Sequence, residues 1–69
     1  MNGTLIGKYN GFVQQAQDAE RQKNWTYAAK MWGEALRVSG MLPRRHGRNY
    51  CTNRQAFCQG MERRATNAG

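Results

Sequence analysis

The sequence has little of the chemistry that enzymes and metalloproteins use. Its 69 residues include four acidic side chains, one histidine, two cysteines and one proline. Acid–base catalysis needs several titratable groups close together, and a structural zinc site needs four ligands. His46, Cys51 and Cys58 supply at most three ligands, without a Cys-x-x-Cys spacing. We therefore expect no catalytic residue, no bound metal or cofactor, and no small-molecule substrate.

Long apolar runs are also missing. Near the N-terminus, Leu5 and Ile6 form the longest aliphatic stretch, far short of the roughly 7 to 15 apolar residues of a signal peptide. No segment approaches the ~20 apolar residues of a membrane-spanning helix. These absences predict a cytoplasmic protein without a membrane partner.

Negative charge is scarce as well, and the formal net charge is +7. Residues 41–69 contain six arginines against Glu62, which places +5 of the +7 in this segment. The positive electrostatic field of such a segment attracts polyanions and acidic proteins, but it does not distinguish one nucleic-acid sequence from another. Within it, Arg44, Arg45 and Arg48 are either part of a solvated basic loop or a contact for nucleic acid or an acidic partner.

Apolar residues recur at helical spacing in two segments. The pattern predicts helices over about 12–23 and about 27–39, with N-caps at Asn10 and Thr26 and a left-handed C-cap at Gly40. The break between them is short, so the two helices must form an antiparallel hairpin. The apolar positions are Phe12, Val13, Ala16 and Ala19, followed by Tyr27, Ala28, Ala29, Met31, Trp32, Ala35, Leu36 and Val38.

The placement of Ala28, Trp32 and Ala35 looks like the second helix of a tetratricopeptide repeat. One repeat cannot bury both faces of its hairpin, so we expect a third amphipathic helix over about 48–63 to close it. The prediction is an all-α fold in one small domain, with flexible ends at 1–9 and 65–69. Because so short a chain has a marginal core, we also expect a homodimer or larger homo-oligomer.

The third helix repeats its apolar face every seven residues. Tyr50 and Phe57 form one row, and Cys51 and Cys58 form the next. Seven helical residues separate the cysteine backbones by roughly 10 Å, beyond the ~7 Å limit for a disulfide. The thiols are therefore read as buried packing, with a redox pair or an intermolecular disulfide as the alternatives.

Arg54 lies within this face, where an arginine without a partner is costly. It either reaches solvent or a helix-end carbonyl, or it binds a carboxylate across a dimer seam or on another protein. Trp25 and Trp32 also have two interpretations each, either as core packing or as contacts with a partner. The candidate partner-binding residues are Trp25, Trp32, Leu36, Tyr50, Arg54 and Phe57.

Several of these residues together resemble the ANR family, the AraC negative regulators of enteric and other Gram-negative bacteria. The resemblance covers about residues 12–58, and its most specific part is the ending aromatic-Cys-x-x-Arg-x-x-Phe-Cys. The residues that carry it are Ala16, Ala19-Glu20-Arg21, Trp25, Ala28-Ala29, Trp32, Ala35, Asn49-Tyr50-Cys51, Arg54 and Ala56-Phe57-Cys58.

The resemblance implies a small helical cytoplasmic protein that binds AraC-type transcription activators, keeps them from forming active dimers and lowers virulence-gene expression. It also implies contact with DNA or nucleoid proteins. The PerC-like activators share the Ala-Ala-x-x-Trp element at residues 28–32. The alternative expectation is therefore a direct DNA-binding or nucleoid-associated regulator that uses the basic C-terminal segment.

Overall fold

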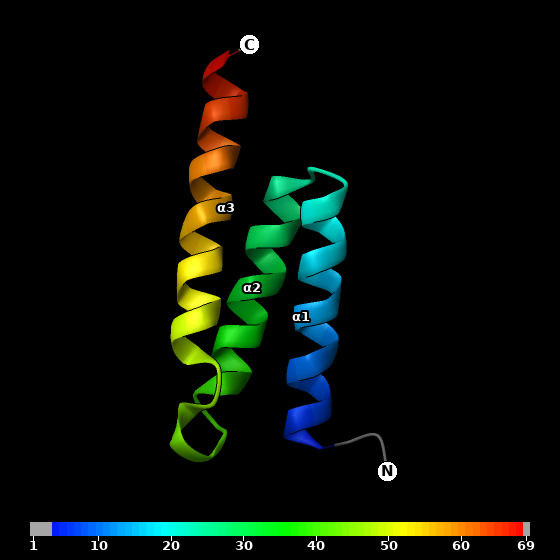
Figure 1. The fold of residues 1–69 in the computed structure, drawn as a ribbon, viewed down its shortest axis with the longest axis vertical. Helices are drawn as coiled ribbons and strands as arrows, with labels where there is room; N and C mark the ends of the chain where they lie inside the picture. Colours follow the sequence, from blue (N-terminus) through cyan, green and yellow to red (C-terminus); the bar gives the residue numbers. More distant parts are fainter. Residues whose placement is uncertain (1–3, 69) are drawn as a thin grey trace.

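The structure, a computed structural model, describes residues 4–68, with side chains as far as residue 66. Within that range the chain is all-helical and contains no strand. α2 lies between α1 and α3, and the three helices form a thin, elongated arrangement of 44 × 21 × 13 Å between Cα atoms (Figure 1). The predicted hairpin with a third helix packed against it is confirmed. The elements are α1 (Leu5–Arg21), α2 (Trp25–Ser39), the 3-10 turn η1 (Pro43–Arg45) and α3 (Arg48–Ala68).

The first helix begins at Leu5, about seven residues earlier than predicted. Thr4 has extended backbone angles, and its hydroxyl accepts a hydrogen bond from the Gly7 N–H at 3.1 Å. This is the geometry of an N-cap, so Thr4 holds the role that was predicted for Asn10. Further along, the Tyr9 side chain is buried in the core. The prediction of a flexible N-terminal stretch is therefore wrong for residues 5–9, and residues 1–3 lie outside the described range.

The turn between α1 and α2 is short, as predicted, but its cap lies at a different residue. The Asn24 side chain accepts a hydrogen bond from the Tyr27 N–H at 3.3 Å, so α2 begins at Trp25. The hydroxyl of Thr26, the predicted cap, instead donates to Glu62 of α3 at 2.7 Å. This bond ties the start of α2 to the later turns of α3.

The connection from α2 to α3 is ordered rather than irregular. α2 ends at Gly40 as predicted, but Gly40 keeps right-handed angles (φ −62°, ψ −20°), so the predicted left-handed cap is wrong. The residues of this connection with left-handed backbone angles come after Gly40, and Gly47 is one of them (φ 75°). A Cβ at Gly47 would lie 1.9 Å from the Tyr9 hydroxyl oxygen. Both the backbone angle and the close approach of Tyr9 require glycine there.

The core combines alanines with one large ring. Ala16, Ala28 and Ala35 are fully buried, and so is the side chain of Trp32. Small side chains let α1 and α2 approach closely, while the indole fills the space that remains. Cys51 and Cys58 are also fully buried and are free thiols, so the prediction that they serve as packing is confirmed.

The third helix is longer than expected. It was predicted to end near residue 63, with a flexible tail over 65–69, but it continues to Ala68. Its last turns extend past the α1–α2 turn (Figure 1). Gly69 lies outside the described residues. Across residues 4–68, no helix combines the length and apolarity needed to cross a lipid bilayer.

Candidate functional site

A groove of about 580 Å³ lies between α1 and α3. Four of the six residues predicted to bind a partner line it: Trp25, Tyr50, Arg54 and Phe57. The remaining lining residues come from α1 and were not predicted: Gln17, Glu20 and Arg21. The structure thus brings the aromatic and arginine candidates of two helices onto one surface, which we call the α1–α3 groove.

One carboxylate organises the base of this groove. Oε2 of Glu20 accepts hydrogen bonds from the Trp32 indole at 2.6 Å, from Nε of Arg54 at 3.2 Å and from the Cys58 thiol at 3.3 Å. Oε1 accepts a further bond from Nη2 of Arg54, so the ion pair is bidentate. Each of the three helices contributes to this cluster, which we call the Glu20 node.

The node keeps Glu20 and Arg54 charged. Burial by itself would raise the pKa of Glu20, but the hydrogen bonds from Arg54, Trp32 and Cys58 outweigh it and lower that pKa below its usual value. The hydrogen bond to Glu20 raises the pKa of Arg54. Burial, followed by the neighbouring Glu20 carboxylate, raises the pKa of the Cys58 thiol to about 12. Cys58 is therefore a neutral hydrogen-bond donor at neutral pH.

Arg54 thus has a partner within its own chain. The sequence offered solvent or a helix-end carbonyl on one side, and a carboxylate across a dimer seam or on another protein on the other. The partner is a carboxylate, but it is Glu20 of the same chain, which neither alternative named. The guanidinium also lies over the Phe57 ring, 4.4 Å from its centroid. Its side chain remains 35% exposed, and its Nη1 group makes no hydrogen bond among the described residues.

The aromatic rings of the groove contact one another edge to face. Trp25 and Phe57 lie 5.9 Å apart between ring centroids, and Trp32 and Tyr50 lie 5.2 Å apart. The Tyr50 hydroxyl accepts a hydrogen bond from Gln17 at 3.3 Å. Tyr50 and Phe57 nevertheless stay 46% and 45% exposed. They are held in place while nearly half of each side chain faces solvent.

Two predicted partner residues do not belong to this surface. Trp32 is 0% exposed and lies beneath the groove, where it contacts Glu20 and Tyr50. Its prediction as a direct partner contact is therefore wrong, because the indole completes the core instead. Leu36 is half-buried, packs against the core and does not line the groove.

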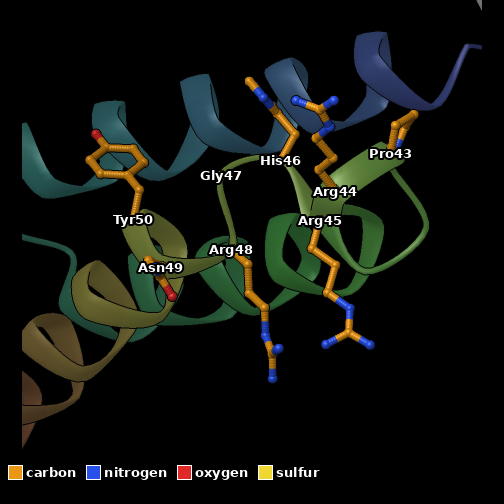
Figure 2. A pocket seen from close by; sticks show the side chains of 8 residues that line it. All are labelled: Pro43, Arg44, Arg45, His46, Gly47, Arg48, Asn49 and Tyr50. Atoms are coloured by element: carbon orange, nitrogen blue, oxygen red, sulfur yellow. The ribbon is translucent and has the colours of Figure 1, made fainter.

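The three predicted basic contacts line a second hollow of about 530 Å³, formed by residues 43–50. Arg45 and Arg48 extend to one side of the turn, while Arg44 extends to the other side with His46 (Figure 2). Among the described residues, the arginines in ion pairs are Arg21, Arg37 and Arg54. Arg44, Arg45 and Arg48 therefore have no carboxylate partner there.

The turn beneath these arginines is packed against the rest of the chain. The buried hydroxyl of Ser39 donates to the His46 carbonyl at 2.6 Å. The His46 ring meets the edge of Tyr9 at 5.5 Å between centroids. The Tyr9 hydroxyl in turn accepts a hydrogen bond from the Cys51 thiol at 3.5 Å. Burial, with a smaller effect from Cys51, raises the pKa of Tyr9 to about 12.

Metal-ligating side chains do not converge in residues 4–68. No three histidine, cysteine, aspartate or glutamate side chains of that range lie close enough to hold an ion. Burial raises the pKa of Cys51, against the opposing effect of its hydrogen bond to Tyr9. Both thiols thus lie in surroundings that favour the protonated form over the thiolate that metal binding requires.

No family model, curated protein or solved structure matches this chain. The resemblance to the ANR family therefore rests on the sequence motifs alone. Some of the residues that carry it line the groove, namely Glu20, Arg21, Trp25, Tyr50, Arg54 and Phe57. Others, such as Ala16, Trp32 and Cys58, are buried in the core.

Proposed function

We propose that this chain is a small non-enzymatic transcription regulator of the bacterial cytoplasm. It binds an AraC-type activator through the α1–α3 groove, blocks activator dimerisation and lowers virulence-gene expression. The observation that carries the proposal is the gathering of Trp25, Tyr50, Arg54 and Phe57 around one groove. These residues also belong to the motifs that resemble the ANR family.

The groove has the composition of a protein-binding surface. Tryptophan, tyrosine and arginine are the residues that most often dominate binding energy at protein interfaces. Arg54 is held by two hydrogen bonds to Glu20, and Phe57 is held between Arg54 and Trp25. Side chains fixed before binding lose less conformational entropy when a partner docks. A preformed aromatic surface of this kind favours docking over chemistry.

Co-purification with candidate AraC-type activators, combined with reporters for their promoters, tests this proposal. Phe57→Ala and Tyr50→Ala should weaken capture of the activator and restore promoter activity. Tyr27→Ala is the matched control, because Tyr27 is 41% exposed but does not line the groove. Failure of every candidate activator to co-purify, or equal effects of Phe57→Ala and Tyr27→Ala, would contradict the proposal.

Direct binding to DNA, or to a nucleoid protein on DNA, is the second candidate function. It is favoured by Arg44, Arg45 and Arg48, which line one hollow on the basic segment and have no carboxylate partner within residues 4–66 (Figure 2). In a DNA titration, each phosphate contact that is removed should lower the slope of log K against log salt by about 0.9. Arg44→Gln/Arg45→Gln should therefore reduce this slope. An equal reduction in Arg63→Gln/Arg64→Gln would show that the slope depends on the net charge of the chain and not on contacts at the basic turn. No affinity at low salt sinks this candidate.

Self-association is the remaining part of the proposal. The later turns of α3 carry a hollow of about 230 Å³ lined in part by Ala56, Gly60 and Met61. Ala56 is exposed and Met61 is half-buried, so this face of α3 is open to a second copy. Light scattering should give a dimer or larger assembly for the parent chain and a smaller species for Met61→Glu. A monomer for the parent at high micromolar concentration excludes this assembly.

A further inference from the structure

We infer that the α1–α3 groove takes an acidic amphipathic helix. The inference rests on the proposed docking function and names the chemistry of the partner segment. It is carried by three observations: the surplus of hydrogen-bond donors in the groove, the spacing of its rings, and the bonds that already engage the four acidic side chains of this chain.

The polar groups of the groove are mostly donors. Both oxygens of Glu20 are occupied by bonds from within the chain. Among the described residues, Arg54 keeps an unused Nη1 group and the Tyr50 hydroxyl keeps its proton. Arg21 pairs with Asp18 through Nη2, but its side chain is largely exposed at the rim and its other guanidinium N–H groups can still meet a ligand. A guanidinium group binds a carboxylate more strongly than a neutral acceptor. The groove therefore favours a ligand that brings carboxylates.

The apolar part of the groove matches the repeat of a helix. Tyr50 and Phe57 are seven residues apart on α3, or roughly 10.5 Å along its axis. Side chains at positions i, i+4 and i+7 of a second helix recur over the same length. A helix lying along α3 can thus place one apolar side chain beside each ring while its carboxylates meet Arg54 and Arg21.

A second copy of this chain does not supply those carboxylates. All four acidic side chains are already bonded: Glu20 in the node, Asp18 to Arg21, Glu34 to Arg37, and Glu62 to Thr26. Each copy also carries a net charge of +7, so a second copy would bring positive rather than negative charge to this groove. The charge of the chain therefore favours an acidic segment from a different protein.

Selection from a library of 18-residue helical peptides against the full-length chain tests the inference. The library varies both the charged and the apolar positions, so the groove itself chooses the composition. We expect acidic peptides with apolar residues at i, i+4 and i+7. The best peptide should bind Phe57→Ala about ten-fold more weakly than the parent. It should bind Tyr27→Ala and Arg44→Gln/Arg45→Gln within about two-fold of the parent.

Three results would overturn the inference: no enrichment, a neutral or basic consensus, or acidic peptides that bind Phe57→Ala as tightly as the parent. Loss of binding in Arg44→Gln/Arg45→Gln alone would assign the acidic ligand to the basic turn instead. Amide spectra of each variant, recorded beforehand, establish that it is folded. The selection contains no activator. A groove that binds acidic helices, while the chain changes the activity of no reporter, would therefore contradict only the proposed function.

Discussion

α1 meets its two neighbouring surfaces in different ways. Against α2 it presents Ala16 and Ala19, which share one buried core with Ala28 and Ala35. Against α3 it uses long side chains, through the bonds of Glu20 to Arg54 and of Gln17 to Tyr50. The first seam is packed through small side chains, and the hollow at its end, lined in part by Ala19 and Tyr27, measures only about 150 Å³. The second is bridged at a distance, and the space over the bridge is the α1–α3 groove. One seam thus makes the fold, and the other makes the candidate site.

The largest effect is expected at Trp32, which belongs to both seams. Its indole is fully buried, donates to Glu20 and meets the edge of Tyr50. Trp32→Ala should cost about 3–5 kcal/mol of unfolding free energy, which is most of the stability expected for a chain of this length. Circular dichroism during urea titration should give a largely unfolded variant. Cooperative unfolding within about 1 kcal/mol of the parent would contradict the role of Trp32 in both seams.

A smaller effect is expected when the charge of the node is removed. Glu20→Gln should cost about 1.5–3 kcal/mol at pH 7, because it weakens hydrogen bonds to a charged group. The folded pKa of Glu20 is lowered, so the stability it contributes is present above its unfolded pKa and is lost as the pH falls through the folded value. The parent should therefore weaken more than the variant below about pH 5.

Urea unfolding at a series of pH values measures this difference. Glu34→Gln serves as the control, since Glu34 pairs with Arg37 at the surface, where such pairs contribute about 0–1 kcal/mol. If the free energy of unfolding falls equally with decreasing pH in the parent and in Glu20→Gln, the Glu20 node is not the source of the pH dependence.

At alkaline pH the chain should lose stability because the buried Cys58 thiol and Tyr9 hydroxyl resist ionisation in the folded state. The pKa values of Cys58 and Tyr9 are each raised to about 12 in the folded chain. Unfolding lets both groups ionise at their ordinary values, so stability is intact below about pH 9 and falls between about pH 9 and 12. Each group adds at most about 1.4 kcal/mol per pH unit. Cys58→Ala should show a shallower alkaline loss in urea titrations, and an unchanged slope would rule out the contribution of Cys58.

The smallest effect on stability is expected in the groove itself. Phe57→Ala removes an edge contact with Trp25 and the contact with Arg54, each worth about 0.5–1 kcal/mol at an exposed site. Thermal unfolding should place it close to Tyr27→Ala, which lies outside the groove. A loss above about 3 kcal/mol would instead make Phe57 part of the core.

Much of the fold was predictable because it depends on local patterns. Ala28, Trp32 and Ala35 recur at helical spacing, and the seven-residue interval placed Cys51 and Cys58 on one buried face. The start of α1 was missed because Leu5 and Ile6 are exposed and give no apolar pattern. A signal was present, since Tyr9 continues the spacing of Phe12, Ala16 and Ala19.

The partner of Arg54 could not be read from the sequence. Glu20 lies 34 positions away, and the two meet only because both α1 and α3 pack on α2. The helical pattern does place Glu20 one turn after the buried Ala16, which marks it as a carboxylate near the core. Which basic residue it meets depends on the angle and register of α3, and no local pattern encodes these.

The central claim is that one carboxylate of α1 holds α3 in position and so forms the groove. A double-mutant cycle with Glu20→Gln and Arg54→Gln, followed by urea unfolding at pH 7, tests it most directly. We expect the two substitutions to be strongly coupled, by about 1.5–3 kcal/mol, because either one alone breaks the bidentate pair. Additive costs within about 0.5 kcal/mol would mean that α3 is held by other contacts, and would contradict the account.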